Sequence, residues 1–281
     1  MENMTTNLQR LLLALVFLPV VSDAKELPLW EAGAGLGVLS LPDYRGSDEQ
    51  RSYVLPIPYL VYRGEKIKVD RQVVRGLLYK SERTELDFDF NGSPPVKSAK
   101  NQARAGMPNL DPTLEAGPSL KIKLIDNSDS GLKLHLLMPL RTVYATDFSR
   151  TRHVGYVFSP KLNWNFSKAG PQHKWNFGLS AGPVFADSKN YNYYYAVDNA
   201  YATPARPSYT PRGGYGGFQL TMAANRRFEN MWFGAFVRVD DMHGAVFADS
   251  PLVKTQRNVL AGVGASWIFA KSSRLVQAEE E

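Results

Sequence analysis

The pentapeptide Gly178-Leu179-Ser180-Ala181-Gly182 has the Gly-x-Ser-x-Gly spacing of a hydrolase nucleophile. That spacing supports catalysis when a sharp turn between a strand and a helix exposes the serine hydroxyl to a histidine base. Here the segment continues an alternating run of apolar and small residues, which predicts the middle of a strand. Ser180 is then a small residue on the polar face of that strand, and we expect no catalytic residues in this chain.

Two further patterns resemble cofactor or metal sites. Gly33-Ala34-Gly35-Leu36-Gly37 has the spacing of a dinucleotide-binding loop, but no helical pattern follows it. The chain has no Cys, which excludes a disulfide scaffold and a thiolate metal site. Its four histidines lie on different segments without metal-ligand spacing: His135, His153, His173 and His243. The sequence therefore predicts neither a cofactor nor a metal ion.

Charged side chains form a third constellation on one face of neighbouring alternating segments. Its members are Lys121, Lys123, Lys133, Arg141, Lys161 and Glu115. A cationic wall that lined a pore would attract anions and disfavour cations. The same cations could instead pair with Asp87, Asp89 and Glu115 and simply keep a polar interior solvated. The net charge is +6, but the basic residues are scattered, so nucleic acid is not an expected partner.

These side chains lie in segments where apolar and polar residues alternate with a period of two, which predicts that β-strands position them. The clearest run has Leu114, Ala116, Pro118, Leu120, Ile122 and Leu124 on one face and Thr113, Glu115, Gly117, Ser119, Lys121 and Lys123 on the other. Such runs extend over about eleven to fourteen residues, whereas strands of soluble sandwiches average about five or six and bilayer-crossing strands need about nine to eleven. The chain is therefore predicted to be all-β, a closed antiparallel transmembrane β-barrel with oily residues outside.

Connector lengths alternate as they do in outer-membrane barrels, where short periplasmic turns alternate with longer extracellular loops. Long connectors are expected at 41–50, 91–112, 145–152, 187–212 and 241–256, and short ones at 63–64, 126–130, 167–172 and 227–230. The alternation requires an odd number of strands within 65–90. Three strands there, at 66–70, 73–79 and 84–90, give twelve in total, and one long strand gives ten.

The five Trp residues provide an independent test of this topology, because aromatic residues gather at both interfaces of a membrane barrel. All of them fall at the predicted periplasmic rim: Trp30, Trp164, Trp175, Trp232 and Trp267. The place of Trp232 in the in–out alternation of its strand could instead point its side chain into the barrel. The opposite rim is expected to carry Tyr144, Tyr156, Phe158, Phe185 and Phe218.

The first 24 residues have the features of a secretory signal peptide. Arg10 precedes an apolar run over 11–21, and Ser22-Asp23-Ala24 resembles a cleavage site. The apolar run is about eleven residues long, too short for a membrane anchor of about twenty. We therefore expect a signal peptide at 1–24, an outer-membrane barrel at 25–269 and a polar periplasmic tail at 270–281.

Short motifs in the connectors and strand ends carry a family resemblance. They are Pro42-Asp43-Tyr44-Arg45-Gly46-Ser47-Asp48, Leu55-Pro56-Ile57-Pro58-Tyr59, Asp249-Ser250-Pro251-Leu252-Val253 and Trp267-Ile268-Phe269. Together they resemble the MltA-interacting protein (MipA/OmpV) family of outer-membrane proteins. The resemblance implies a non-enzymatic barrel that acts as a scaffold between a lytic transglycosylase and a murein synthase. The alternatives are a small-solute channel with a basic lumen wall and a surface adhesin that uses 191–209.

Overall fold

The computed structural model of the chain describes residues 25–64, 67–69, 74–76, 78–127, 131–147, 149–167 and 175–278. The predicted signal peptide at 1–24, His173, and parts of the short connectors at 126–130 and 167–172 lie outside the described residues. In the part that is described, no helix has both the length and the apolarity needed to cross a membrane.

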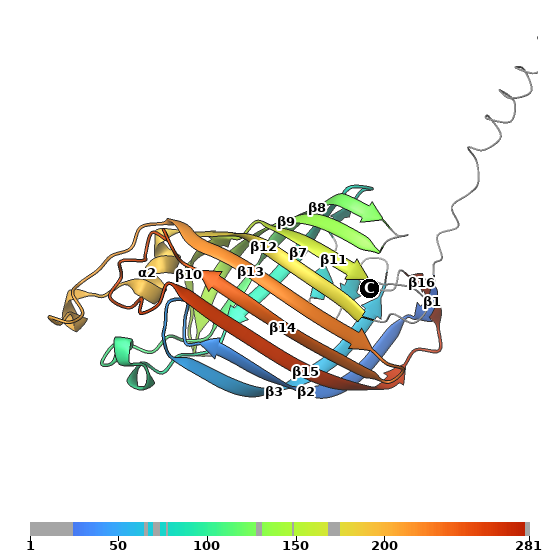
Figure 1. Cartoon of the computed structure of the whole chain (residues 1–281), viewed down its shortest axis with the longest axis horizontal. Coiled ribbons are helices and arrows are strands. Elements are labelled where there is room, and N and C mark those ends of the chain that lie inside the picture. The colour runs from blue at the N-terminus through green and yellow to red at the C-terminus, as the bar shows by residue number, and fades with distance from the viewer. Residues whose placement is uncertain are drawn as a thin grey trace, which may run out of the picture.

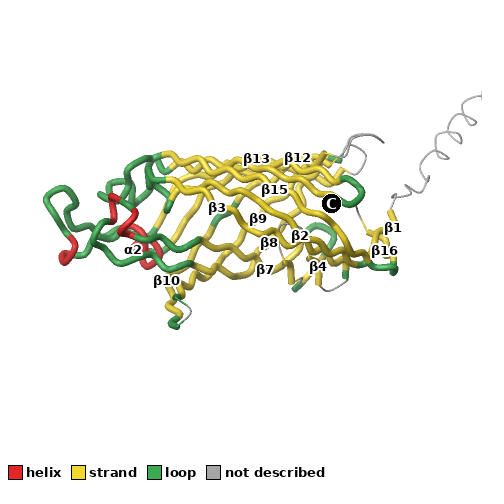
Figure 2. The backbone as a smooth tube through the Cα atoms, turned by 90° about the horizontal axis from the view of Figure 1, so that it is seen from below, coloured by secondary structure: helices red, strands yellow, loops and turns green. Residues whose placement is uncertain are grey.

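One large antiparallel sheet wraps around a central axis (Figures 1 and 2). Its strands are β2 (Trp30–Pro42), β3 (Gln50–Arg63), β4 (Ile67–Val69), β5 (Val74–Gly76), β6 (Tyr79–Lys80), β7 (Thr84–Ser93), β8 (Thr113–Asn127), β9 (Leu132–Thr146), β10 (Thr151–Phe158), β11 (Lys161–Ser167), β12 (Trp175–Ala186), β13 (Gly214–Arg227), β14 (Met231–Asp241) and β15 (Arg257–Lys271). Their order is β5-β4-β3-β2-β15-β14-β13-β12-β10-β9-β8-β7-β6, and β11 lies between β12 and β9.

The two ends of this path meet, because β5 lies beside β7 as well as β4. If β10 and β11 are counted as one interrupted strand, and β5 and β6 as another, the barrel has twelve strands. The prediction of three strands within 65–90 is thus confirmed, and the ten-strand alternative is wrong. The long connectors also fall where alternation placed them, since β2 ends at Pro42 and β3 begins at Gln50, for example.

Side-chain exposure follows the predicted period of two. On β15, Val263, Trp267 and Phe269 are exposed, while Ser266 and Ile268 between them are buried. On β2, the apolar side chains of Leu36 and Val38 retain 65% and 47% exposure. A continuous band of exposed apolar side chains is the expected surface of a barrel that faces lipid.

The long connectors contain helical structure that the sequence analysis did not anticipate. They hold helix α2 (Ser188–Tyr195) and the 3-10 turns η1 (Ser98–Lys100), η2 (Gln102–Arg104) and η3 (Asn199–Tyr201). Asp187 caps α2, because its carboxylate accepts a hydrogen bond from the Asn190 backbone N–H at 2.9 Å. The helix consists largely of Tyr and Asn, which are weak helix formers, so periodicity alone did not reveal it.

A separate two-stranded sheet lies at the opposite end of the barrel, to the right in Figure 1. It pairs β1 (Lys25–Pro28) with β16 (Leu275–Ala278), and we call it the terminal ribbon. The Leu29 N–H donates to the Arg274 carbonyl at 2.8 Å, which connects the ribbon to the barrel. The barrel strands therefore begin at Trp30 and end at Lys271, and the segment expected to be only a polar tail contributes a strand.

Candidate functional site

The long connectors fold together over one end of the barrel, where Figure 1 shows them gathered around α2. Four buried residues of the cluster, Val143, Ala145, Val184 and Ala186, belong to the ends of β9 and β12, so the connectors pack against the barrel mouth. We call the whole cluster the loop cap. Its buried members are Tyr44, Val96, Leu110, Val143, Ala145, Val154, Val157, Val184, Ala186, Tyr191, Tyr195, Val197, Met242, Ala245, Phe247 and Leu252.

Aromatic stacking forms the centre of the loop cap. The rings of Phe247 and Tyr195 are 3.8 Å apart and nearly parallel, and Tyr191 lies 4.8 Å from the same Phe247 ring. The Tyr195 hydroxyl donates to the Arg45 carbonyl at 3.0 Å. Burial raises the pKa of Tyr195 well above its ordinary value and raises the pKa of Tyr191 to about 12. Both tyrosines are therefore neutral at physiological pH, which suits an apolar core.

The motif at 42–48 joins the first connector to the last one. The Tyr44 hydroxyl donates to the Leu252 carbonyl at 2.8 Å, and the Gly46 N–H donates to the Asn258 side chain at 2.6 Å. Gly46 has a φ of +93°, and a Cβ there would approach Val253 to 3.2 Å. Only glycine accepts that backbone conformation without strain. This part of the motif is required for packing of the connectors.

The acidic side of the same motif joins the first and second connectors. Asp43 is buried and accepts hydrogen bonds from Arg51 at 2.5 and 3.0 Å and from Asn101 at 2.9 Å. Asn101 also donates to the buried Ser47 hydroxyl at 3.1 Å. Pro42 is buried as well, whereas Asp48 is exposed. The residues that the resemblance singled out are thus mostly engaged with other parts of the loop cap.

The predicted lumen cations lie on the inner face, and Arg141 is the best connected of them. Its buried guanidinium contacts Asp89 at 2.8 Å and Glu115 at 2.8 Å, and it donates to Ser159 at 3.0 Å. Every edge of the guanidinium fork is therefore occupied by an oxygen of the barrel itself. Such a group fixes three strands, β7, β8 and β9, in one register.

The other cations of this wall also meet acidic partners. Lys121 and Lys123 contact Glu85 at 3.1 and 3.5 Å. Lys161 is half-buried, and Asp89 is the carboxylate that acts on its charge. Lys133 lies opposite Asp126 in the β8–β9 register. The geometry favours the interpretation in which these cations pair within a polar interior over a bare cationic wall.

A second inner group was missed by the sequence analysis. Asp240 is fully buried on β14, contacts Arg238 at 3.2 Å and lies 3.9 Å from the Arg45 guanidinium. Arg45 also donates to the Gly216 carbonyl at 2.7 Å, so this group links the motif at 42–48 to the inner wall. Its signal was present, because Val237 and Val239 alternate with Arg238 and Asp240 on the same strand.

The predicted aromatic rims differ from expectation at one residue. Trp30, Trp175 and Trp267 are exposed on the outer surface, and Trp164 is half-buried. Trp232 points inward instead, where it packs against Tyr59, Val61 and Ile268. Successive side chains of a strand point to opposite faces, and the next residue, Phe233, is exposed on the outside, so Trp232 points inward. At the other rim, Phe185 is half-buried and the remaining predicted residues are exposed: Tyr144, Tyr156, Phe158 and Phe218.

A buried ion cluster lies inside the barrel near the terminal ribbon. Glu31 is fully buried, contacts Arg227 at 2.7 Å and Arg63 at 3.4 Å, and accepts a hydrogen bond from the Tyr59 hydroxyl at 3.3 Å. Arg63 also donates to the Pro28 carbonyl of β1 at 2.7 Å. The cluster therefore connects the inner wall to the root of the ribbon.

The motifs that resembled catalytic and cofactor sites have strand geometry. Ser180 lies within β12, opposite Asn163 and Thr221, and no strand-to-helix turn exposes it. The glycine motif at 33–37 lies within β2. The three described histidines lie apart: His135 on β9, His153 between the rings of Tyr144 and Tyr156, and His243 beside Asp241. Among the described residues, no group of three or more His, Asp or Glu is placed to hold a metal ion.

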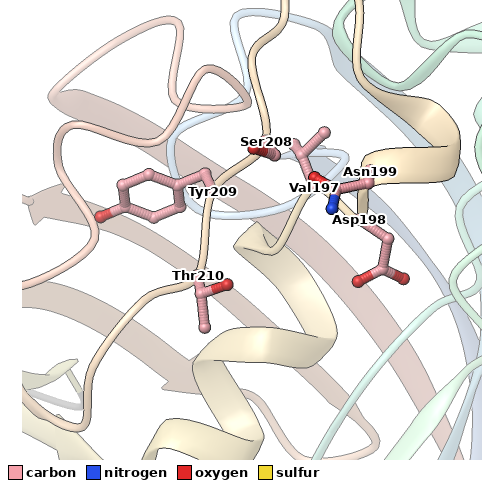
Figure 3. Close-up of a pocket in the computed structure, with 6 residues that line it drawn as sticks. All are labelled: Val197, Asp198, Asn199, Ser208, Tyr209 and Thr210. Carbon is pink, nitrogen blue, oxygen red and sulfur yellow. The ribbon is translucent and has the colours of Figure 1, made fainter.

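A polar pocket of about 220 Å³ lies on the connector between β12 and β13 (Figure 3). The Tyr209 hydroxyl donates to the Val246 carbonyl at 3.2 Å, and its ring points away from Asp198 and Asn199. The aromatic ring is thus engaged with a neighbouring connector rather than presented to a ligand. The pocket is lined by Val197, Asp198, Asn199, Ser208, Tyr209 and Thr210.

Comparison with known proteins gives one specific match. The family model described as MltA-interacting protein MipA matches residues 34–269. A search of curated protein sequences finds no match. Among solved structures, outer membrane phospholipase A from Escherichia coli is 10% identical, with 90% of this chain and 94% of that chain covered and a TM-score of 0.34. Outer membrane protease OmpT from Escherichia coli is 6% identical, with 89% and 99% covered and a TM-score of 0.32. Likeness at this level carries no argument about activity.

Proposed function

The chain belongs to the MltA-interacting protein MipA family, and from this premise we propose that it is a non-enzymatic scaffold of the outer membrane. It holds peptidoglycan-remodelling enzymes at the membrane, a lytic transglycosylase first and a murein synthase second. The observation that supports this proposal is the terminal ribbon, which extends the chain beyond the barrel at the end opposite the loop cap (Figure 1).

The ribbon lies on the side where such partners would be found. Outer-membrane barrels place their short turns and both chain ends in the periplasm and their long connectors outside. The ribbon leaves the barrel at the end of the short turns, such as the one between Arg227 and Met231. A periplasmic partner would therefore meet the ribbon, the short turns and the Trp rim.

The backbone of the ribbon favours β16 over β1 as the docking edge. The Leu29 N–H bonds to the Arg274 carbonyl, and an antiparallel ladder alternates bonded and non-bonded pairs. The N–H groups of Leu275 and Gln277 then point to the outer edge of β16. Pro28 lacks an N–H on the outer edge of β1, which blunts that edge. A partner strand can add to β16, as in other complexes formed by strand addition.

The test changes one backbone donor at each edge. Gln277→Pro removes an outward N–H of β16, and we expect capture of a purified MltA-type lytic transglycosylase to fall at least ten-fold in a pull-down. Glu26→Pro makes the matched change on the outer edge of β1 and should leave capture unchanged. Deletion of 272–281 removes β16 and should abolish capture. If Gln277→Pro and the deletion both capture normally, the scaffold does not act through the ribbon and the proposal fails.

The channel alternative is less well supported by the geometry. The loop cap packs at the barrel mouth, and the described lumen cations meet acidic partners, which disfavours a free cationic wall. We expect the purified protein to show no steady conductance in planar bilayers. A steady conductance whose reversal potential indicates anion preference would instead support the channel with a basic lumen wall.

A further inference from the structure

The outer face of β13 ends in a charge. Arg226 lies opposite Trp175 of β12 and Phe233 of β14 in the sheet register, and both of these aromatic side chains are exposed on the outer surface. Arg226 therefore belongs to the surface that faces lipid, at the height of the Trp rim. The apolar residues that precede it on the same face are Phe218, Leu220, Met222 and Ala224.

Aromatic rings hold the Arg226 guanidinium in place. Its Cζ lies 4.6 Å from the centre of the Phe228 ring and 5.6 Å from that of Trp175. Phe228 in turn contacts Phe233 edge-on at 5.7 Å. Contacts of a guanidinium with aromatic faces are favourable and restrict its orientation. The side chain is thus positioned rather than free to extend into water.

The guanidinium lacks the acidic partner that its neighbour has. Arg227, one residue later, points inward and contacts Glu31 at 2.7 Å. Within the described part of the chain, Arg226 has no carboxylate partner, and its Nε is inaccessible to solvent without a hydrogen-bond acceptor. A charge on a lipid-facing surface is costly unless it is paired or reaches the interface. An anion from outside the described part of the chain can supply the acceptor that Arg226 lacks there.

We propose that Arg226 binds the phosphate of a phospholipid in the periplasmic leaflet, with the acyl chains along the apolar face of β13. Because Nε is enclosed, the two terminal Nη groups of the guanidinium are the donors that can meet the two non-bridging oxygens of a phosphodiester. Trp175, Phe228 and Phe233 line the site and shield the ion pair from water. The site opens onto the apolar band, which favours a lipid headgroup over free inorganic phosphate.

Native mass spectrometry of the full-length protein in detergent tests the proposal. The protein is delipidated and titrated with palmitoyl-oleoyl phosphatidylglycerol, with the same-chain diacylglycerol and inorganic phosphate as separate arms. We expect Arg226→Gln to weaken retention of phosphatidylglycerol about ten-fold or more, the loss of a charge-assisted contact. Arg274→Gln removes an exposed arginine at the same end and should have no effect. Phe228→Leu keeps the charge and should give an intermediate loss.

Each other outcome overturns the assignment. Equal retention by Arg226→Gln and the unsubstituted protein would show that Arg226 does not bind the headgroup. Retention of diacylglycerol as strong as that of phosphatidylglycerol would show that the acyl chains alone bind. Displacement by millimolar inorganic phosphate would identify a phosphate site that needs no lipid. A gel-shift assay of heated and unheated samples confirms that each variant is a folded barrel.

Discussion

Phe247→Ala should open the loop cap and leave the barrel strands in place. Phe247 is fully buried and stacks on Tyr195 at 3.8 Å, so its removal leaves a cavity at the centre of the cap. Truncation of a buried Phe costs about 3–5 kcal/mol. We expect proteolytic cleavage within 187–212 to accelerate about a hundred-fold or more in the reconstituted protein, since cleavage follows the population of the open form.

Phe218→Ala is the matched control for this experiment. Phe218 is an aromatic residue of β13 near the same end, but it faces outward and is exposed. Its removal should leave the cleavage rate in the connector unchanged. If Phe247→Ala is cleaved no faster than Phe218→Ala, the connectors do not depend on this stack, and the loop cap is not the cooperative unit that the packing indicates.

The packing of the loop cap changes the interpretation of the motif at 42–48. Asp43, Tyr44 and Gly46 each bind another connector, Gly46 through its carbonyl and the Lys254 N–H, and Arg45 reaches the inner wall at Asp240. A motif that carries a family resemblance would ordinarily be examined first as a ligand site. Here its residues determine how three connectors pack, so its substitution should affect the loop cap before it affects any partner.

The barrel could be predicted from the sequence because lipid imposes a simple pattern on every strand. Side chains that face the bilayer are apolar, so a run such as 114–124 shows where the strand lies, how long it is and which of its side chains point to lipid. Trp232 shows the limit of this reasoning. The predicted topology placed Trp232 at the rim, and the alternation along its strand allowed an inward direction. The cluster of Tyr59, Val61 and Ile268 against which it packs depends on the register between strands, which the sequence does not show.

Other features depend on contacts between distant segments, which a single sequence does not show. The terminal ribbon joins Lys25–Pro28 to Leu275–Ala278, four-residue strands that lie far apart in the sequence. The loop cap draws on connectors with no common period. Arg226 is the opposite case. Its charge on the apolar face of 218–226 is visible in the sequence, and the structure adds that no described carboxylate pairs with it.

The ion pairs of the lumen were predictable in kind but not in geometry. The alternation of the sequence predicted Lys121 on the inner wall, but Glu85 was not among the expected partners, and the register of β7 and β8 sets it opposite Lys121. Arg141 is different, because it collects Asp89 and Glu115 from two strands at once. It is therefore the residue whose removal tests whether the interior is a packed polar network or a water-filled lumen.

Arg141→Met should destabilise the barrel strongly. It keeps the length of the side chain but leaves two inner carboxylates, Asp89 and Glu115, without the cation that both contact at 2.8 Å. Removal of one partner from a buried ion pair costs about 3–5 kcal/mol. Urea unfolding in lipid vesicles, followed by Trp fluorescence, should show a loss of this size. Arg152→Met removes an exposed contact with Asp111 at 2.9 Å and should cost about 1 kcal/mol or less.

The size of this loss separates two pictures of the interior. Bulk water inside the barrel would solvate Asp89 and Glu115 once Arg141 is gone, and the cost would then approach that of the exposed Arg152 pair. A packed interior leaves the carboxylates unsolvated, and the full cost remains. A loss below about 1 kcal/mol would therefore contradict the packed network and revive the open channel, whereas a loss of about 3 kcal/mol or more would support the packed network.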